Sequence, residues 1–297
     1  MHEPGEWGHA PVLLDDVLAL LAPRAGGLVV DGTIGRGGHA AAILAAGARV
    51  VGIDRDPDAI AAVAARLGAA VELHHAPFSS IPAVLGDRLA DGVLLDLGVS
   101  SPQLDRPERG FSFRSDGPLD MRMDPTRGVP VGEWLDGVDE EALADVLWRY
   151  GEERASRRVA RAILAARPLR TTLQLAEVVA KVLPRERGLH PATRTFQALR
   201  IQINGELDEL AAALRDIPER LAPGGRFVVI AFHSLEDRAV KQAFRALAGE
   251  GAPVDLRGHP LVAPRFRLVE RRARKGEERD DNPRARSARV RALERLP

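Results

Sequence analysis

The sequence contains no cysteine among its 297 residues, which excludes disulfide bonds and thiolate metal ligands. It also lacks a run of roughly 18 apolar residues, so we expect no membrane-spanning helix. The first residues show no basic stretch followed by an apolar one, so we expect no secretory signal and a cytoplasmic location. Apolar residues still make up 45% of the chain, which is enough to build a sizeable core.

The chain also lacks a net charge, because 42 basic side chains balance 42 acidic ones. The balance is uneven, however. From Arg257 to the C-terminus, 13 basic and 6 acidic side chains leave a local excess of seven positive charges. A basic segment on a neutral protein is typical of contact with a polyanion such as a nucleic acid, but a solvated arginine-rich surface gives the same pattern. Charge alone leaves both interpretations open.

Strand-like and helix-like segments alternate through the first hundred residues. Short apolar or β-branched runs occur at 27–31, 48–54, 69–75 and 91–98, and helical patterns at 39–47 and 57–68 separate the first three. This order predicts an α/β fold with a doubly wound, mostly parallel, Rossmann-like sheet. Ligands bind such sheets outside the carboxyl ends of the strands.

The alternation stops after Gly98. Residues 105–130 are loop-like, and helical patterns follow at 139–151, 153–167 and 171–183. A longer pattern from 190 predicts one long helix that returns the chain to the sheet, where strand character resumes at 226–234 and again at 264–270 and 285–293. We therefore expect a sheet domain of residues 1–104 and 201–297 with a helical insertion at 105–200. The charged stretch 270–287 predicts a mobile loop.

The stretch "DGTIGRGGHA" joins the first strand to the first helix. Gly35, Gly37 and Ala40 fit the dinucleotide pattern G-x-G-x-x-G/A, which favours NAD. Asp31 at the strand tip would repel a diphosphate and attract a cationic ligand instead. Asp54 ends the second strand, where an acid accepts the hydroxyl groups of a ribose. S-adenosylmethionine carries an ammonium, a sulfonium and a ribose but no phosphate, so the two acids favour it over NAD.

The fourth strand ends in "LLDLGVSSPQLD". Asp96 lies at its carboxyl end, and Ser100-Ser101-Pro102-Gln103 resembles a diverged form of the polar-proline motif of amino-methyltransferases. The amino group of cytosine is a poor nucleophile, because its lone pair is delocalised into the ring. A carboxylate, hydroxyl or carbonyl that accepts its protons would help to localise that lone pair. The alternative is that Asp96 and the serines simply cap a turn.

The chain is similar to the bacterial 16S rRNA (cytosine-N4)-methyltransferase family, over nearly its whole length. The motifs that carry this resemblance run in order from residue 11 to about 291, and several are long and unusual. They are "PVLLDDV", "DGTIGRGGHA", "GIDRDPDAI", "APFS", "LLDLGVSSPQLD", "RGFSFRSDGPLDMRMDPTRG", "YGEERASRRVARAI", "HPATRTFQALRIQIN", "LAPGGRFVVIAFHSLEDRAVK" and "NPRARSARVR".

This resemblance implies an enzyme that uses S-adenosylmethionine to methylate a cytosine N4 in the decoding region of 16S rRNA. The implied partner is an assembled small subunit, with the helical insertion and the arginine-rich segments contacting RNA phosphates. The motifs leave open whether the chain is a monomer or a homodimer. Methyl transfer from S-adenosylmethionine needs no catalytic metal, so we expect none. Ile34 departs from the family pattern, where we expect an aromatic residue.

The resemblance also implies a set of site residues. Asp54 would take the ribose, Phe78 would lie against the adenine, and Asp31 would support the methionine end. The cofactor residues are Asp31, Gly37, Gly38, His39, Asp54, Phe78, Asp96 and Gln103. From the fourth-strand motif, we expect Asp96, Ser100 and Ser101 to act in catalysis.

Other polar clusters have ordinary explanations. His74 and His75 lack further ligand spacing, so we predict no metal there. Asp116, Asp120 and Asp124 recur every four residues but flank a proline and a glycine, which favours loop hydrogen bonding over a cation or RNA site. His233 and Ser234 would either contact the target base or end a strand. A hydrolase is disfavoured because no G-x-S-x-G turn is present.

Two other functions remain as hypotheses beside the methyltransferase. One is an NAD-dependent oxidoreductase, although a second nucleotide-binding half is not recognisable. The other is a non-catalytic ribosome-assembly factor that retains the pocket.

Overall fold

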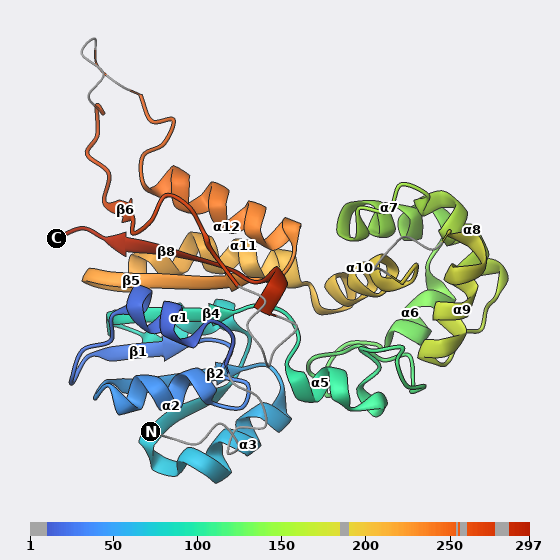
Figure 1. The fold of residues 1–297 in the computed structure, drawn as a ribbon, viewed down its shortest axis with the longest axis horizontal. Helices are drawn as coiled ribbons and strands as arrows, with labels where there is room; N and C mark the ends of the chain where they lie inside the picture. The colour runs from blue at the N-terminus through green and yellow to red at the C-terminus, as the bar shows by residue number, and fades with distance from the viewer. Residues whose placement is uncertain (1–10, 185–189, 254, 256–259, 277–284) are drawn as a thin grey trace. The chain divides into compact units, whose positions relative to one another are not determined.

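The computed structural model describes residues 11–184, 190–253, 255, 260–276 and 285–297 (Figure 1). The chain divides into two compact units. The sheet unit comprises Met1–Gly98 and Asp208–Pro297, and the helical unit comprises Val99–Leu207. The domain limits expected from the sequence, at 104/105 and 200/201, fall a few residues inside the helical unit.

The sheet unit is built on one sheet with the strand order β3-β2-β1-β4-β5-β8-β6, with β7 also paired to β8. Strands β1 to β5 run parallel, and β8 is antiparallel to β5. This order confirms the predicted doubly wound, mostly parallel sheet. The strands are β1 Leu28–Asp31, β2 Arg49–Asp54, β3 Val71–His75, β4 Ala90–Asp96, β5 Leu221–Ala231, β6 Phe266–Leu268, β7 Arg274–Lys275 and β8 Arg289–Arg295.

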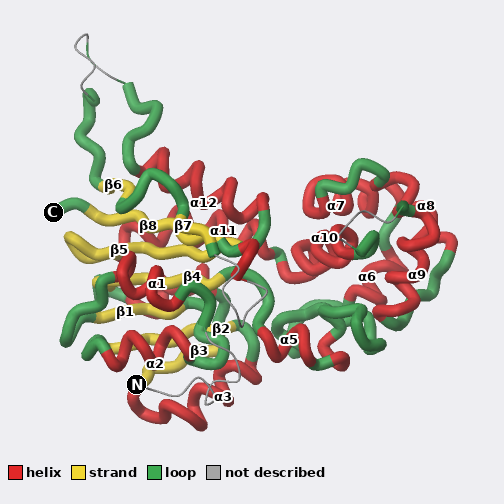
Figure 2. The backbone as a smooth tube through the Cα atoms, viewed as in Figure 1, coloured by secondary structure: helices red, strands yellow, loops and turns green. Residues whose placement is uncertain are grey.

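Helices cover both faces of this sheet (Figure 2). Val228 and Ile230 of β5 pack in one cluster with apolar residues of α1 and α2. Phe227 points to the opposite face, because alternate residues of a strand do so, and its ring lies 5.4 Å from that of Phe244 on α12. The helices are α1 Leu14–Leu21, α2 Gly38–Ala45, α3 Pro57–Leu67, α4 Ile81–Leu85, α11 Glu206–Asp216 and α12 Ser234–Leu247.

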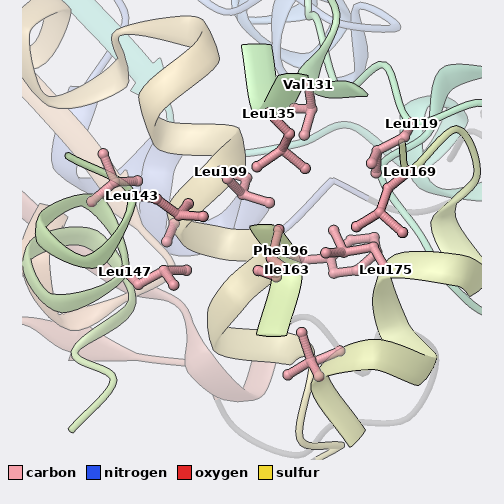
Figure 3. Packing of buried hydrophobic residues seen from close by; sticks show 14 of the residues in the cluster. Leu119, Val131, Leu135, Leu143, Leu147, Ile163, Leu169, Leu175, Phe196 and Leu199 are labelled. Carbon is pink, nitrogen blue, oxygen red and sulfur yellow. The ribbon is translucent and has the colours of Figure 1, made fainter. Parts of the chain in front are cut away.

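The helical unit has its own apolar core (Figure 3). Leu143 and Leu147 of α7 meet Phe196 and Leu199 of α10 in this core. The segment 105–130 is irregular, as predicted, but it also contributes buried side chains to the same cluster, among them Met121. The helices of this unit are α5 Ser101–Asp105, α6 Val131–Gly137, α7 Glu140–Gly151, α8 Ser156–Ala165, α9 Thr172–Val182 and α10 Thr193–Asn204.

The predicted single long helix after residue 190 is wrong. Helix α10 ends at Asn204, and Gly205 adopts a left-handed conformation with φ 59° before α11 begins. A glycine in this conformation is a common helix terminator, because it has no Cβ to clash. The side chain of Asn204 accepts a hydrogen bond from the backbone N–H of Met123 at 2.7 Å and donates one to the carbonyl of Met121. Asn204, the last residue of α10, therefore links the end of this helix to the irregular segment 105–130.

The charged stretch 270–287 is only partly a loop in the described structure. Arg274 forms ion pairs with Glu270 and with Asp16 of α1, and it begins β7. Residues 277–284 of the predicted mobile loop lie outside the described residues. No helix in the described part of the chain has the length and apolar character needed to cross a bilayer.

Candidate cofactor site

Three aspartates lie at the carboxyl ends of neighbouring parallel strands in the sheet unit. Asp31 ends β1, Asp54 ends β2 and Asp96 ends β4, and β1 lies between the other two strands. The chain order reverses between β1 and β4, which is where doubly wound sheets bind ligands. The strand-end acids predicted from the sequence therefore lie at one edge of one sheet.

Asp31 and His39 are buried at this edge, with 1% and 7% of their surfaces exposed. Burial raises the pKa of Asp31 to about 7, although the nearby His39 lowers it. His39 stands in the first turn of α2, and its Nε2 lies 3.7 Å from Oδ2 of Asp96. That distance is too long for a hydrogen bond. The three side chains thus face one another without pairing closely.

Several polar atoms of this group have no hydrogen-bond partner among the described residues. They are both ring nitrogens of His39 and Oδ1 of Asp96, and all are buried. Buried polar atoms are nearly always satisfied in folded proteins. Unsatisfied donors and acceptors that converge at a strand switch point indicate a place for a polar, charged ligand.

Asp54 organises the glycine turn as well as ending β2. Its Oδ2 accepts a hydrogen bond from the N–H of Gly35 at 2.9 Å, and its Oδ1 accepts one from the N–H of Asp56 at 2.9 Å. Burial nevertheless raises the pKa of Asp54 to about 6. Each carboxylate oxygen can accept a further hydrogen bond, so the side chain can hold a ribose hydroxyl while it fixes the turn.

The turn between β1 and α2 needs its glycines for both shape and space. Gly35 and Gly37 have φ values of 51° and 78°, which residues with a side chain rarely adopt. A Cβ on Gly32 would lie 2.6 Å from Leu95 and 3.3 Å from the Cβ of Phe78. Phe78 therefore stands directly beside this turn. A Cβ on Gly38 would lie 2.5 Å from Pro11.

Ile34, the departure from the family pattern, belongs to the core. It is 3% exposed, and a Cβ on Gly52 of β2 would lie 2.2 Å from its Cδ1. Its side chain therefore fills the space above a glycine of the neighbouring strand.

Thr33 is a site residue that the sequence analysis missed. Its Oγ1 accepts a hydrogen bond from the backbone N–H of Asp96 at 2.6 Å, and its own N–H donates to Oδ1 of Asp31 at 3.3 Å. It thus links the ends of β1 and β4 and orients the Asp31 carboxyl group. The only signal in the sequence is a hydroxyl two positions after the strand-end acid.

Ser100, Ser101 and Gln103 belong to the helical unit and lie at the start of α5. The Oγ of Ser100 accepts from the N–H of Gln103, and Oε1 of Gln103 accepts from the N–H of Ser100 at 2.9 Å. This reciprocal capping box is the pattern expected at a helix N-terminus. Gln103 is 5% exposed. The geometry described for these residues is helix capping, and their contact with cofactor or base stays a prediction.

The remaining candidates have local partners. His74 lies 2.8 Å from Glu72, and Nε2 of His75 lies 2.9 Å from the carbonyl of Arg55. His233 caps α12, where its Nδ1 accepts from the N–H of Glu236.

The three aspartates in "DGPLDMRMD" bond within the helical unit, as predicted. Asp116 accepts from the N–H of Leu173, Asp120 pairs with Arg122, and Asp124 accepts from Thr126. Loop hydrogen bonding therefore accounts for this repeat.

The fold and this edge of the sheet define a class of protein. The carboxyl groups of Asp31 and Asp96 suit the ammonium and sulfonium charges of S-adenosylmethionine, Asp54 suits its ribose, and Phe78 offers an apolar surface for its adenine. A diphosphate would instead meet Asp31 and Asp96. The residues present therefore fit the cofactor of the S-adenosylmethionine-dependent methyltransferases.

Comparisons with known proteins agree with this class. The chain belongs to the MraW methylase family, whose model matches residues 6–296, and its cofactor is S-adenosylmethionine. It is 51% identical over 306 residues to a ribosomal RNA small subunit methyltransferase H from Thioalkalivibrio sulfidiphilus, covering 97% of each chain. It is 53% identical over 305 residues to the protein of that name from Azoarcus sp., covering 97% of this chain and 96% of the relative.

The likeness to solved structures is much looser. An rRNA methylase from Streptococcus thermophilus is 12% identical with a TM-score of 0.40, covering 96% of this chain and 94% of the other. Family membership, rather than this likeness, identifies the chain as a methyltransferase. The comparisons do not support the NAD-dependent oxidoreductase.

Proposed function

We propose that this chain transfers a methyl group from S-adenosylmethionine to the N4 amino group of a cytosine in the decoding region of 16S rRNA. The substrate would be an assembled small subunit. Family membership and the names of the relatives support an rRNA substrate. The observation that carries the chemistry is the group of buried Asp31 and His39 with half-buried Asp96. The unpartnered atoms of His39 and Asp96 converge at the strand switch point.

The side chains of the sheet unit hold and orient the cofactor. Asp31 would take the ammonium of its methionine part, and Asp54 would accept hydrogen bonds from the ribose hydroxyls. His39 would donate a hydrogen bond from a ring N–H to the methionine carboxylate. Because these groups are fixed by the backbone of a rigid sheet, they bind without much reorganisation.

S-adenosylmethionine supplies a methyl group that is already activated by the positive sulfur. The protein therefore needs mainly to align the amine with that methyl group. The N4 nitrogen would form the new bond to the methyl carbon as the carbon–sulfur bond breaks with its electron pair going to sulfur, and N4 would release one proton. Oδ1 of Asp96, which is buried and has no partner among the described residues, would accept this proton. The cytosine has to leave its base stack to reach the site.

The helical unit contributes Ser100, Ser101 and Gln103 in this proposal. The serine hydroxyls accept the amino protons of cytosine and help to localise its lone pair. The capping box at the start of α5 holds the backbone of this motif in one conformation.

Methyl transfer to small subunits tests the proposal. Tritiated S-adenosylmethionine is incubated with small subunits from cells that lack this protein, and with naked 16S rRNA in parallel. We expect label in the rRNA of the subunits, and a rate at least about a hundredfold lower for Asp96→Asn.

Calorimetry with S-adenosylmethionine separates this proposal from a non-catalytic assembly factor. Cofactor binding without any label in the rRNA would favour the assembly factor. Label in naked rRNA only would contradict the assembled subunit as substrate.

A further inference from the structure

Several arginines of the segments that the sequence marks for RNA contact pair with acids of this chain. In "RTFQALR", Arg200 forms a bidentate pair with Glu206 at 2.8 Å. In the basic C-terminal segment, Arg289 and Arg291 both pair with Asp237, which is buried on α12. These pairs hold elements together, so other side chains have to carry much of the RNA recognition.

A groove between α7 and α8 offers such side chains. The two helices are joined by a short connection, and Arg161 late in α8 lies 3.3 Å from Glu140 at the start of α7. They therefore run as a helical hairpin, with the end of α7 beside the start of α8. We call Trp148, Arg149, Arg154, Arg157 and Arg158, which line the groove near the connection, the hairpin tip.

The two signs of charge are separated along this groove. The acids that line it lie mainly at the start of α7, where Asp139 caps the helix, Glu140 pairs with Arg161, and Glu141 is exposed. Asp145, nearer the tip, pairs with Arg149 at 2.8 Å.

The tip itself keeps three arginines free. Arg154, Arg157 and Arg158 are exposed and have no side-chain partner among the described residues. Arg157 and Arg158 lie on α8 outside its buried face, which is formed by Val159, Ala160 and Ile163, and Arg154 lies in the connection before the helix.

Trp148 gives the tip a second kind of contact. It is 57% exposed, more than most large apolar side chains of the described chain. An exposed indole ring beside free guanidinium groups matches the surfaces that bind single-stranded nucleic acid, where bases stack on aromatic rings and cations follow the phosphates. An acidic protein would use the arginines but would leave the flat ring without a matching face.

We propose that the hairpin tip binds a single-stranded segment of RNA, with one unpaired base stacked on Trp148 and the phosphates held by Arg154, Arg157 and Arg158. This inference rests on the proposed function in one respect, that the substrate is RNA. It adds a binding surface in the helical unit that contains none of the proposed cofactor residues.

Fluorescence anisotropy with a fluorescein-labelled single-stranded RNA of mixed sequence tests the surface on the whole protein. We expect Trp148→Ala to weaken binding about tenfold, because one stacked base is lost. The triple variant R154Q/R157Q/R158Q should bind more weakly still. The slope of its log affinity against log salt concentration should be smaller in magnitude by about two than that of wild type. The matched control is R24Q/R49Q/R245Q, which removes three exposed arginines of the sheet unit and should bind RNA within about twofold of wild type.

Two measurements keep this test separate from the test of the proposed function. Calorimetry with S-adenosylmethionine should give wild-type affinity for every variant, since none touches the cofactor site. Methyl transfer to small subunits should show a raised KM for the tip variants with kcat little changed. If Trp148→Ala and the triple variant bind RNA as wild type does, the tip is not an RNA surface, even if methylation succeeds. If wild type binds RNA through the tip but transfers no methyl group, the proposed function fails and this inference stands.

Discussion

At the scale of single residues, the candidate site contains one fully buried carboxyl group, that of Asp31. The pKa of Asp31 is raised by burial from 3.8 to about 7. A group whose pKa is higher in the folded state than in the unfolded state binds more protons in the folded state between those two pKa values. Asp31 therefore favours the folded state below about pH 4 and loses that contribution as the pH rises towards 7.

The same shift predicts how cofactor binding depends on pH. The cofactor ammonium requires ionised Asp31, so binding below pH 7 should release a proton. We expect affinity for S-adenosylmethionine to rise by about tenfold per pH unit between pH 5 and 7 and then to level off. Calorimetry in buffers of different ionisation enthalpy measures the released proton. Asp31→Asn should bind weakly at every pH, and an equally steep pH dependence in that variant would assign the proton to another group.

Asp54 gives a prediction about the ribose. Asp54→Ala removes the acceptor for the ribose hydroxyls and should weaken S-adenosylmethionine binding at least tenfold, because hydrogen bonds to charged groups contribute about 1.5–3 kcal/mol. Calorimetry measures the affinity, and circular dichroism checks that the variant is folded. Asp87→Ala, at an exposed acid, is the control. An unchanged affinity for Asp54→Ala would show that the ribose assignment is wrong.

Thr33 gives a prediction about positioning. Thr33→Val keeps the shape of the side chain but leaves the N–H of Asp96 without its acceptor. We expect the free energy of unfolding to fall by about 1–2 kcal/mol and methyl transfer to slow, while Thr33→Ser restores both. Urea unfolding and initial rates measure the two effects. Equal rates for the valine and serine variants would remove Thr33 from the site.

At the scale of elements, the turn between β1 and α2 is shaped by close packing. Gly32→Ala would place a Cβ 2.6 Å from Cδ2 of Leu95 and 2.9 Å from Cδ1 of Ile81, so these two buried side chains would have to move. We expect a loss of about 1–3 kcal/mol in unfolding free energy together with weaker cofactor binding. The control is Gly137→Ala at the end of α6, where a Cβ meets nothing within 4 Å. Equal stability of the two variants would contradict this account of the turn.

The sequence predicted some elements well and others poorly, for physical reasons. Strands β1 to β4 are short β-branched or leucine-rich runs between turn residues, so local pattern was sufficient. Helix α12 was missed because it follows β5 almost directly and its cap is a histidine, His233, rather than a common capping residue. The break at Gly205 was missed because a single glycine inside a helical pattern can either continue the helix or end it. Packing decides between the two, and the local sequence does not show it.

At the scale of the whole molecule, the sequence located the acids of the site but not the contacts between them. Asp31, Asp54 and Asp96 were found because each ends a strand, and parallel strands bring such residues to one edge. The hydrogen bond from Asp96 to Thr33 joins residues that are 63 positions apart in the chain, and the raised pKa of Asp31 comes mainly from its burial in the folded sheet unit. No local sequence pattern encodes either one.

Charge pattern has the same limit. The excess of arginine near the C-terminus left open contact with a polyanion or a solvated surface, and in the structure several of these side chains pair with acids of the sheet unit. Arg267 meets Glu294 at 2.7 Å, and Arg291 meets Asp237 at 2.8 Å. Composition counts charges, whereas the fold decides which of them stay available.

Mapping the modified nucleotide tests the central claim most directly. Small-subunit rRNA from cells with and without this protein is digested to nucleosides and fragments, and mass spectrometry locates every methylated cytosine. The account predicts one N4-methylated cytosine in the decoding region that is lost without the protein and restored by the wild-type chain but not by Asp96→Asn. An identical methylation pattern in the two rRNAs would contradict it.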